Sequence, residues 1–305
     1  MPHTVIIHAK SVRTHLDKLE KWGLSGTAFE IDGVETDKSI ECYLKIIDFL
    51  TENNFKRSDL LVAFGGGALL DLVGFVAATY MRGVDVIFVP TTLLAMVDAS
   101  IGGKNGLNRP WAKNIIGTTY LPKKTVIDIE FLSTLPEDQL YSGYVEMVKI
   151  AALSDDGFLQ KLHYPPTLEM IDQARQLKEE IVKEDLLDHG KRALLNFGHT
   201  VGHALEVLNK FKMHHGEAVQ HGIQVEMELL NAPDDFIQTV GKKLPYNKKI
   251  PSVETDAFLS ALKKDKKNLG EKIGISNPFY RQGGGYIRYF SVNDVLDAYL
   301  RVLVS

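Results

Sequence analysis

The sequence contains almost no cysteine: Cys42 is the only one among 305 residues. A single thiol excludes a disulfide within the chain and is typical of proteins in a reducing compartment. The first residues, Met-Pro-His-Thr-Val-Ile-Ile-His, also lack the basic and apolar stretches of a secretory signal. We therefore expect a cytoplasmic protein that folds without covalent cross-links.

Neither sign of charge dominates, and no long hydrophobic run is present. With 35 basic and 39 acidic residues the formal net charge is -4, so no strongly basic face is available for nucleic acid. The most apolar segment, residues 60–80, is interrupted by Asp71 and by the triplet Gly65–Gly67. It predicts a strand, a turn and a helix rather than a membrane span. We expect neither a nucleic-acid partner nor a membrane partner.

The first part of the chain has a regular alternation of strand and helix patterns. Apolar runs predict strands at 5–7, 27–31, 60–64, 85–89 and 125–129, and amphipathic or apolar stretches predict helices at 11–21, 39–53 and 68–80. After Pro136 the pattern predicts helices at 137–153, 169–183, 198–208, 217–230 and 255–264, with a last helix capped by Ser291 and Asp294. The expected fold is α/β, with a parallel-sheet domain at 1–136 and an all-helical domain at 137–305.

A glycine triplet lies where the third predicted strand turns into a helix. In Phe64-Gly65-Gly66-Gly67-Ala68 the glycines allow close approach of a pyrophosphate, and the helix start offers free N–H groups. The triplet is not the G-x-G-x-x-G fingerprint, and a tight structural turn is the alternative. Pro90-Thr91-Thr92 supplies two hydroxyls after the next strand, where ligands of α/β sheets bind. Together the two motifs favour a dinucleotide.

Four side chains that bind metals or protons lie close together later in the chain. In Asn196-Phe-Gly-His199-Thr-Val-Gly-His203 the histidines are four residues apart, which puts them on one face of a helix. His215 and Glu217 follow after a short charged connection. Histidine is the commonest metal ligand and titrates nearest neutral pH. The cluster favours a metal or proton-transfer site over a helix with polar histidines on its surface.

With these motifs, the chain resembles the 3-dehydroquinate synthases, the NAD- and zinc-dependent members of the sugar phosphate cyclases. The resemblance runs from about Val5 to Lys267. Its motifs are Gly65-Gly66-Gly67 with Asp71, Tyr80-Met81-Arg82-Gly83, Pro90-Thr91-Thr92-Leu93-Leu94-Ala95-Met96-Val97-Asp98, Ile101-Gly102-Gly103-Lys104, Lys113-Asn114, Glu146 with Lys149, Leu195-Asn196-Phe197-Gly198-His199, His203, His215-Gly216-Glu217 and Asp265-Lys266-Lys267. The resemblance implies a dehydroquinate synthase-like fold, with a Rossmann-like N-terminal domain and a helical C-terminal domain.

The resemblance also implies roles for individual residues. The family's metal ligands fall on Glu146, His199 and His215, with zinc expected and cobalt as an alternative. Its NAD contacts fall on Glu35, Lys38, Gly66, Gly67, Asp71, Thr91, Thr92, Asp98, Lys113 and Thr134. Its catalytic residues fall on Lys104, Lys149, Asp188, Asn196 and His203, and its substrate contacts on Arg82, Asn114, Lys178, Arg192 and Lys267. Arg82 matches an arginine that reaches the neighbouring subunit's phosphate site, which implies a homodimer.

The implied reaction converts 3-deoxy-D-arabino-heptulosonate 7-phosphate to 3-dehydroquinate and phosphate in the shikimate pathway. It proceeds by transient oxidation with NAD, elimination of phosphate, reduction and intramolecular aldol closure, with no net redox change. Two imidazoles and a carboxylate form the ligand set of a catalytic zinc site. Several cations suit an anionic sugar phosphate.

Three departures from the family bear on this expectation. Asp188 stands where the family has Glu, and Leu186 replaces an acidic neighbour. Ala9 occupies a region where the family usually offers Asp or Asn to the adenosine ribose, and the N-terminus is short. Asn105 follows Lys104 where Thr is common.

Simpler roles remain open for three of the cations. Lys104 suits a solvated loop, Lys149 a surface ion pair with Glu146, and Arg192 a position along the surface of the helical domain. The alternative functions are a related sugar phosphate cyclase, a polyol or glycerol-phosphate dehydrogenase of similar fold, and a non-enzymatic relic.

Overall fold

The computed structural model describes residues 3–110, 112–154, 157–210, 212–265 and 267–304. The chain divides into two compact units, Met1–Leu135 and Pro136–Ser305. Lys266, part of one of the motifs above, lies outside the described residues. None of the helices in the described ranges is long and apolar enough to cross a membrane.

The N-terminal unit is built on a five-stranded parallel sheet with strand order β2-β1-β3-β4-β7. Its strands are β1 (Thr4–Ala9), β2 (Thr27–Ile31), β3 (Leu60–Gly65), β4 (Asp85–Pro90) and β7 (Lys124–Thr125). Strand β3 is buried along almost its whole length, as expected for a central parallel strand covered on both faces. The sequence order of the strands reverses between β1 and β3, the point at which open α/β sheets bind ligands.

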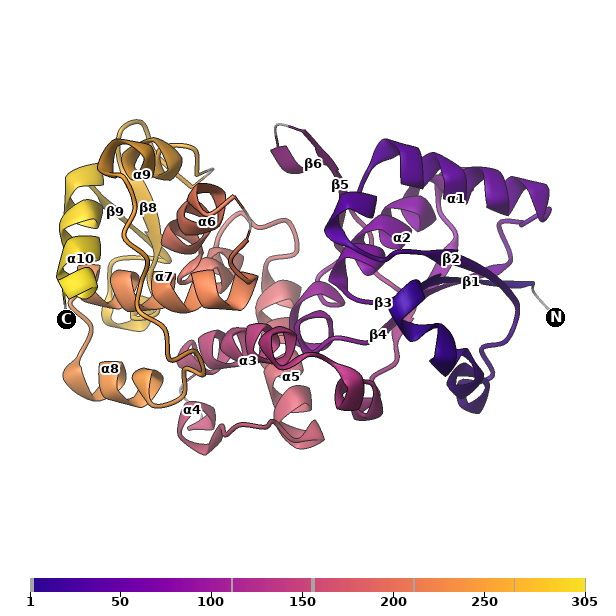
Figure 1. Ribbon diagram of the computed structural model, residues 1–305, viewed down its shortest axis with the longest axis horizontal. Coiled ribbons are helices and arrows are strands. Elements are labelled where there is room, and N and C mark those ends of the chain that lie inside the picture. The colour runs from indigo at the N-terminus through magenta and orange to yellow at the C-terminus, as the bar shows by residue number, and fades with distance from the viewer. Residues whose placement is uncertain (1–2, 111, 155–156, 211, 266, 305) are drawn as a thin grey trace. The chain divides into compact units, whose positions relative to one another are not determined.

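Helices connect the strands of this sheet (Figure 1). The α-helices are α1 (Ile40–Glu52) and α2 (Gly67–Thr79), and the 3₁₀ helices are η1 (Lys10–Trp22), η2 (Glu35–Asp37), η3 (Tyr80–Arg82) and η5 (Ile129–Thr134). Ser39 begins α1 by accepting a 3.1 Å hydrogen bond from the Cys42 amide. Helix α2 is apolar on nearly all sides because it packs on β3 and beneath the hairpin described next.

Three elements of this unit differ from the sequence prediction. The strand expected at 125–129 is wrong beyond Thr125, because Asp128 accepts the Glu130 amide and begins η5 instead. An antiparallel hairpin, β5 (Lys104–Arg109) with β6 (Ala112–Thr119), was not predicted, since its polar, glycine-containing strands lack apolar alternation. A π-helical turn, η4 (Ala95–Ala99), follows Pro90-Thr91-Thr92.

The C-terminal unit consists of helices and one two-stranded antiparallel pair. Its helices are α3 (Glu137–Ala152), α4 (Phe158–Lys161), α5 (Leu168–Glu184), η6 (Lys191–Asn196), α6 (His199–Leu208), α7 (His215–Leu229), α8 (Asp234–Gly241), α9 (Thr255–Leu262), η7 (Tyr280–Gln282) and α10 (Val292–Val304). Its strands are β8 (Ile273–Ser276) and β9 (Ile287–Phe290). The expectation of an all-helical unit is therefore wrong at this pair of strands. Ser291 and Asp294 cap α10 reciprocally, which confirms the predicted helix start.

Helices α6 and α7 lie side by side (Figure 1), and glycines allow their backbones to approach closely. A Cβ built on Gly222 of α7 would lie 1.8 Å from the carbonyl oxygen of Gly198, and one on Gly202 would lie 3.0 Å from that of Ala218. Only glycine fits at such approaches. Gly198 also has a φ of 79°, a left-handed conformation that favours glycine. This packing places the starts of the two helices, His199 and His215, near each other.

Candidate functional site

Three side chains from three helices converge in the C-terminal unit. Glu146 lies on α3 and is fully buried, while His199 and His215 are the first residues of α6 and α7. The Nε2 atom of each histidine lies 3.6 Å from Oε1 of Glu146. One ligand atom from each residue falls within 4.8 Å of the others, close enough to share a metal ion. The sequence prediction grouped these three residues, and the structure brings them together.

The Nδ1 atoms of both histidines face acceptors, which leaves the Nε2 atoms for a metal. Nδ1 of His199 lies 3.2 Å from the Phe197 carbonyl oxygen, which can only accept, so this nitrogen carries the proton. Nδ1 of His215 lies 3.3 Å from Oε1 of Glu206. An outer carboxylate or carbonyl that orients a ligating imidazole is the usual arrangement at metal centres.

Glu206 was missed by the sequence reasoning. It lies three residues after His203 and seven after His199, so helical spacing alone would have placed it on the same face of α6.

The charges around Glu146 suit a cation. Both of its carboxylate oxygens are buried without a hydrogen-bond partner, although Oε2 forms an ion pair with Lys149. Burial favours the neutral acid, yet Lys149 and His215 lower the pKa of Glu146 to about 2. Burial, helped by Lys149, holds the pKa of His199 well below its usual value. The site therefore offers an ionised carboxylate and a neutral imidazole with its lone pair free.

His215 carries the compensating positive charge. Burial opposes that charge, but the carboxylates of Glu146 and Glu206 raise the pKa of His215 to about 10. The carboxylates of Glu146 and Glu206 thus stabilise positive charge on the His215 imidazole. That environment would equally stabilise a metal ion in place of the proton.

Lys149 and His203 border the three ligands. Lys149 is buried and pairs with Glu146 one helical turn away, so the alternative of a surface ion pair is wrong. The His203 ring centroid lies 5.2 Å from that of His199 and 6.4 Å from that of His215. His203 does not belong to the group of three ligands, and its position suits proton transfer beside them.

The other predicted substrate residues of this unit lie on several elements. Lys178 on α5 and Arg192 on η6 are both buried, so a position of Arg192 along the surface is wrong. The Arg192 guanidinium donates to the Leu186 carbonyl at 2.7 Å. Asn196 ends η6 and donates to the Ala193 carbonyl, while Lys267 pairs with Asp265 at 2.7 Å.

Asp188 lies in the turn between α5 and η6 with a φ of 61°. Asp is tolerated in this left-handed conformation better than Glu, which gives a physical reason for the departure from Glu here. Asp185 organises the same turn by accepting the amides of His189, Gly190 and Arg192. Asp188 is not among the three residues grouped as ligands.

In the N-terminal unit the glycine triplet lies at the strand-order reversal between β1 and β3. Gly66 caps α2, and the first turn of α2 begins at Gly67. A Cβ on Gly66 would lie 3.3 Å from Thr92, and one on Gly67 would lie 3.1 Å from Ala99. The turn therefore lies against the segment after β4, where Thr92 accepts the Ala95 amide and Thr91 is buried. A ligand at this edge would meet the positive end of α2 and the two threonines.

Lys38 joins three of the predicted residues of this unit. Its buried Nζ lies 2.6 Å from Oδ2 of Asp71 and 2.5 Å from Oδ1 of Asn114, and 3.6 Å from Glu35. Burial raises the pKa of Asp71 to about 6, against the opposing effect of Lys38. Asn114 was expected to contact substrate, but the structure places it beside the residues expected to contact NAD.

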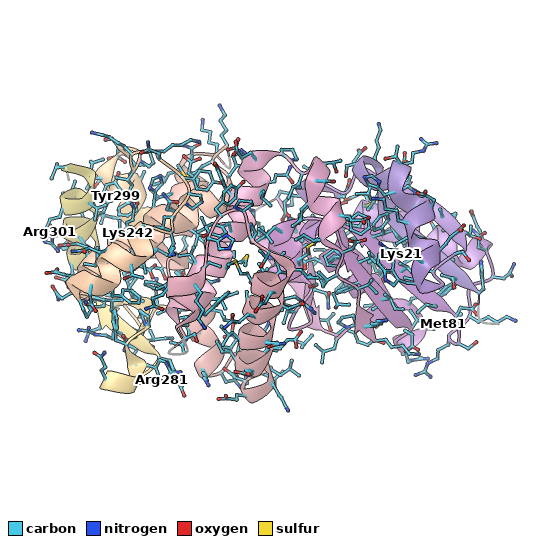
Figure 2. The ribbon with its side chains drawn as sticks, turned by 90° about the horizontal axis from the view of Figure 1, so that it is seen from below. Lys21, Met81, Lys242, Arg281, Tyr299 and Arg301 are labelled. Carbon is cyan, nitrogen blue, oxygen red and sulfur yellow. The ribbon has the colours of Figure 1, made fainter. Side chains whose placement is uncertain are left out.

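The remaining predicted residues of this unit lie at its surface or in turns. Lys104, Lys113 and Thr134 are exposed, and Asp98 in η4 is half-buried. Arg82 is exposed as well and lies in η3, three residues after α2 ends at Thr79. Met81 and Arg82 have φ values of 48° and 64°, and Met81 lies at the surface (Figure 2). This strained turn holds Arg82 outward.

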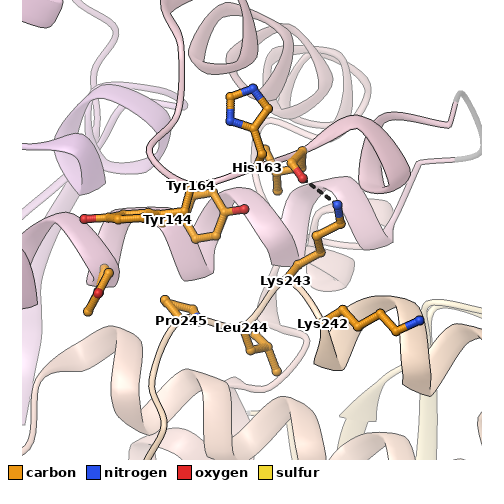
Figure 3. A pocket seen from close by; sticks show the side chains of 9 residues that line it. Tyr144, His163, Tyr164, Lys242, Lys243, Leu244 and Pro245 are labelled. Carbon is orange, nitrogen blue, oxygen red and sulfur yellow. Dashed lines mark hydrogen bonds between the residues drawn. The ribbon is translucent and has the colours of Figure 1, made fainter.

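A separate cavity of about 310 Å³ lies in the C-terminal unit and contains none of the predicted site residues (Figure 3). Tyr144 and Tyr141 line it from α3, two and five residues before Glu146, which puts them on a different side of the helix from Glu146. Lys243 donates to the Leu162 carbonyl at 2.6 Å across its wall. The cavity is therefore distinct from the candidate metal site.

Comparisons with known proteins identify the family of this chain. Residues 28–142 match the family profile described as 3-dehydroquinate synthase N-terminal, and residues 143–268 match 3-dehydroquinate synthase C-terminal. The 3-dehydroquinate synthase of Latilactobacillus sakei subsp. sakei (strain 23K) is 40% identical over 270 residues, covering 85% of this chain and 76% of that protein.

Two solved structures share the fold. The crystal structure of 2-deoxy-scyllo-inosose synthase with carbaglucose-6-phosphate, NAD+ and Co2+ superposes with a TM-score of 0.86 at 23% identity, covering 98% of this chain and 90% of that one. ValA, the 2-epi-5-epi-valiolone synthase from Streptomyces hygroscopicus subsp. jinggangensis 5008 with NAD+ and Zn2+ bound, gives 0.83 at 25% identity, covering 99% and 90%. The predicted fold class is confirmed, and the chain belongs to the 3-dehydroquinate synthase family.

Proposed function

We infer that this chain is a 3-dehydroquinate synthase that depends on NAD and one divalent cation. Its substrate is 3-deoxy-D-arabino-heptulosonate 7-phosphate, and its products are 3-dehydroquinate and phosphate. The observation that carries this inference is the convergence of Glu146, His199 and His215 on one point, in a chain of this family. A related sugar phosphate cyclase and a dehydrogenase of similar fold are the alternatives.

Glu146, His199 and His215 hold the cation, most simply zinc, with cobalt able to replace it. The donor set fits, because a buried carboxylate without hydrogen bonds faces two imidazole nitrogens whose other nitrogens are oriented by Phe197 and Glu206. When bound, the cation supplies a Lewis acid that polarises a substrate hydroxyl or carbonyl. Two structural neighbours with bound Co2+ or Zn2+ support the assignment.

The N-terminal unit, residues 1–136 as a domain, holds NAD. Gly66 and Gly67 place the pyrophosphate at the α2 start, and the acidic Glu35 disfavours a 2′-phosphate and so NADP. NAD supplies reversible hydride acceptance when bound. Lys38, Asp71, Thr91, Thr92, Asp98, Lys113 and Thr134 complete the site. Neighbours with bound NAD+ support it.

The domain at 137–305 holds the cation and binds the substrate. Lys149 stabilises negative charge next to the cation, and His203 moves protons beside it. Lys178, Arg192 and Lys267 bind the anionic groups, while Asn196 orients hydroxyls. Lys104 acts as a further cation in catalysis, Asn114 as a further substrate contact and Asp188 as a further carboxylate. Arg82 completes the phosphate site of a partner subunit in a homodimer.

Phosphate release with NAD and zinc present tests the activity. Incubation with the heptulosonate phosphate should release phosphate without accumulation of NADH. Steady NADH production would point to a dehydrogenase, and phosphate release only from another sugar phosphate would point to a related cyclase.

Metal content tests the ligands separately. His199→Ala should lose both the cation and the activity, whereas His163→Ala, in the separate cavity of the same unit, should keep both. Full metal occupancy by elemental analysis in a Glu146, His199 and His215 triple alanine variant would contradict the assignment.

A further inference from the structure

We propose that Glu226 is a positioning residue for the metal site, a proposal that rests on the proposed function. Glu226 lies on α7 and is fully buried. Its carboxylate holds the start of α6 and thereby fixes His199, the first residue of α6, relative to His215 on its own helix. Neither sequence motifs nor the ligand geometry assigns it this role.

The carboxylate binds amides on both sides of His199. Oε2 accepts the amide of Gly198 at 2.7 Å, and Oε1 accepts those of Thr200 at 3.2 Å and Val201 at 3.4 Å. The first amides of a helix have no partner within the helix, and Gly198 has no side chain to cap them. Glu226 therefore supplies from a neighbouring helix the cap that α6 lacks.

This cap acts on the spacing between the two histidine ligands. His215 and Glu226 lie on the same helix, so holding the α6 start to Glu226 also holds it at a set distance from His215. The ring centroids of His199 and His215 are 5.3 Å apart. Gly222, one turn before Glu226, contacts Gly198 directly. The contact between Gly222 and Gly198 allows α6 and α7 to approach closely. The Glu226 carboxylate then fixes the position of the α6 start along α7.

The complete burial of Glu226 indicates a role beyond packing. A fully buried carboxylate is expensive, and an apolar residue of similar size is often as good or better for stability alone. The hydrogen bonds that the described residues give the Glu226 carboxylate all come from the backbone around His199. The buried carboxylate therefore binds the backbone segment that carries His199, a proposed metal ligand.

The matched comparison is with Glu254, which caps α9 by accepting the amides of Asp256 at 3.0 Å and Ala257 at 2.6 Å. Glu226→Gln and Glu254→Gln each replace a capping carboxylate by an amide, but α9 carries no predicted metal ligand. Zinc affinity is measured by competition with a chromophoric chelator on the full chain. The visible spectrum of the cobalt-loaded protein reports the ligand geometry.

We expect Glu226→Gln to weaken zinc binding about 10- to 100-fold, the usual effect of losing a group that orients a ligand, and to alter the cobalt spectrum. Glu254→Gln should lower the melting temperature and leave zinc affinity and spectrum unchanged. If Glu226→Gln does not fold, Glu226→Asp replaces it, with a smaller loss expected because the charge is kept and the reach is shortened.

A folded Glu226 variant with the wild-type zinc affinity and cobalt spectrum would overturn the proposal. A wild-type protein that binds no zinc would instead refute the proposed function, so the two failures are distinguishable.

Discussion

Gly222→Ala tests how the helix crossing builds the metal site. The added Cβ would lie 1.8 Å from the Gly198 carbonyl oxygen and 2.8 Å from both the Gly198 carbonyl carbon and the Gly202 amide. That carbonyl accepts the Gly202 amide at 3.0 Å, the first hydrogen bond of α6. The methyl group therefore meets backbone rather than a flexible side chain, and α6 must move.

The size of the movement follows from the contact distance. Carbon and oxygen atoms pack at roughly 3.5 Å, so the α6 start would retreat by about 1.7 Å. Zinc sites tolerate only about 0.2 Å around their ligand distances. His199 would leave the ligand set, and we expect zinc affinity to fall about 100-fold, the upper end for losing ligand orientation. Overpacking should also cost about 3 kcal/mol, offset by about 1 kcal/mol from the better helix propensity of Ala.

The control is Gly241→Ala on α8, where an added Cβ meets nothing within 4 Å. It should leave zinc affinity unchanged and stabilise slightly, by up to about 1 kcal/mol. Urea unfolding of the metal-free protein gives the stability, and chelator competition gives the affinity. If Gly222→Ala bound zinc as tightly as Gly241→Ala does, the crossing would not set the ligand geometry and the reasoning would fail.

Four further predictions concern other residues. Arg82→Ala should raise KM for the substrate about 10- to 100-fold while the dimer persists in sedimentation, because a charge-assisted contact is worth about 1.5–3 kcal/mol; a fully active monomer would reject the shared site. Asp188→Asn should lower phosphate release strongly and Asp188→Glu should keep or raise it, and equal rates in all three proteins would remove the catalytic role. The raised pKa of Asp71, about 6 in the folded protein, means that the native state binds more protons than the unfolded state between pH 4 and 6. Its contribution to stability is therefore fully present below pH 4 and is lost as pH rises through 6, so the stability difference between wild type and Asp71→Asn should fall by up to about 3 kcal/mol over this range; a flat difference in urea titrations would contradict the shift. Calorimetry should show that NAD binds at least tenfold more tightly than NADP, and Glu35→Ala should reduce this difference in affinity. Tighter binding of NADP than of NAD to the wild type would exclude the role of Glu35.

Much of the fold could be predicted because its signals are local. The strands of the parallel sheet are apolar runs, and Ser39 and Ser291 announce helix starts by side-chain caps. The segment at 125–129 failed because Asp128 forms a turn despite the apolar residues around it. The β5–β6 hairpin could not be predicted, because backbone pairing between its two strands defines it and their side chains show no alternating apolar pattern.

The candidate site was predictable only as far as side chains carry the chemistry. Glu146, His199 and His215 were found by residue type and resemblance, and their roles stay predictions. Glu206 could have been found by helical spacing. Glu226 could not, because its partners are backbone amides of another helix, and no sequence pattern records which helix packs on which. The placement of Asn114 beside Lys38 depends in the same way on a hairpin that the sequence does not announce.

The three candidate ligands link cation binding to the thermal stability of the C-terminal unit. Because they belong to α3, α6 and α7, a cation held by all three would close the chain from residue 146 to 199 and again from 199 to 215. Because the unfolded chain does not preserve the site, such a cation stabilises the folded state by its binding free energy. The whole effect falls on the C-terminal unit, since the described residues of the N-terminal unit supply no member of the group. In a calorimeter, the transition of this unit should then shift to lower temperature when a chelator removes the cation.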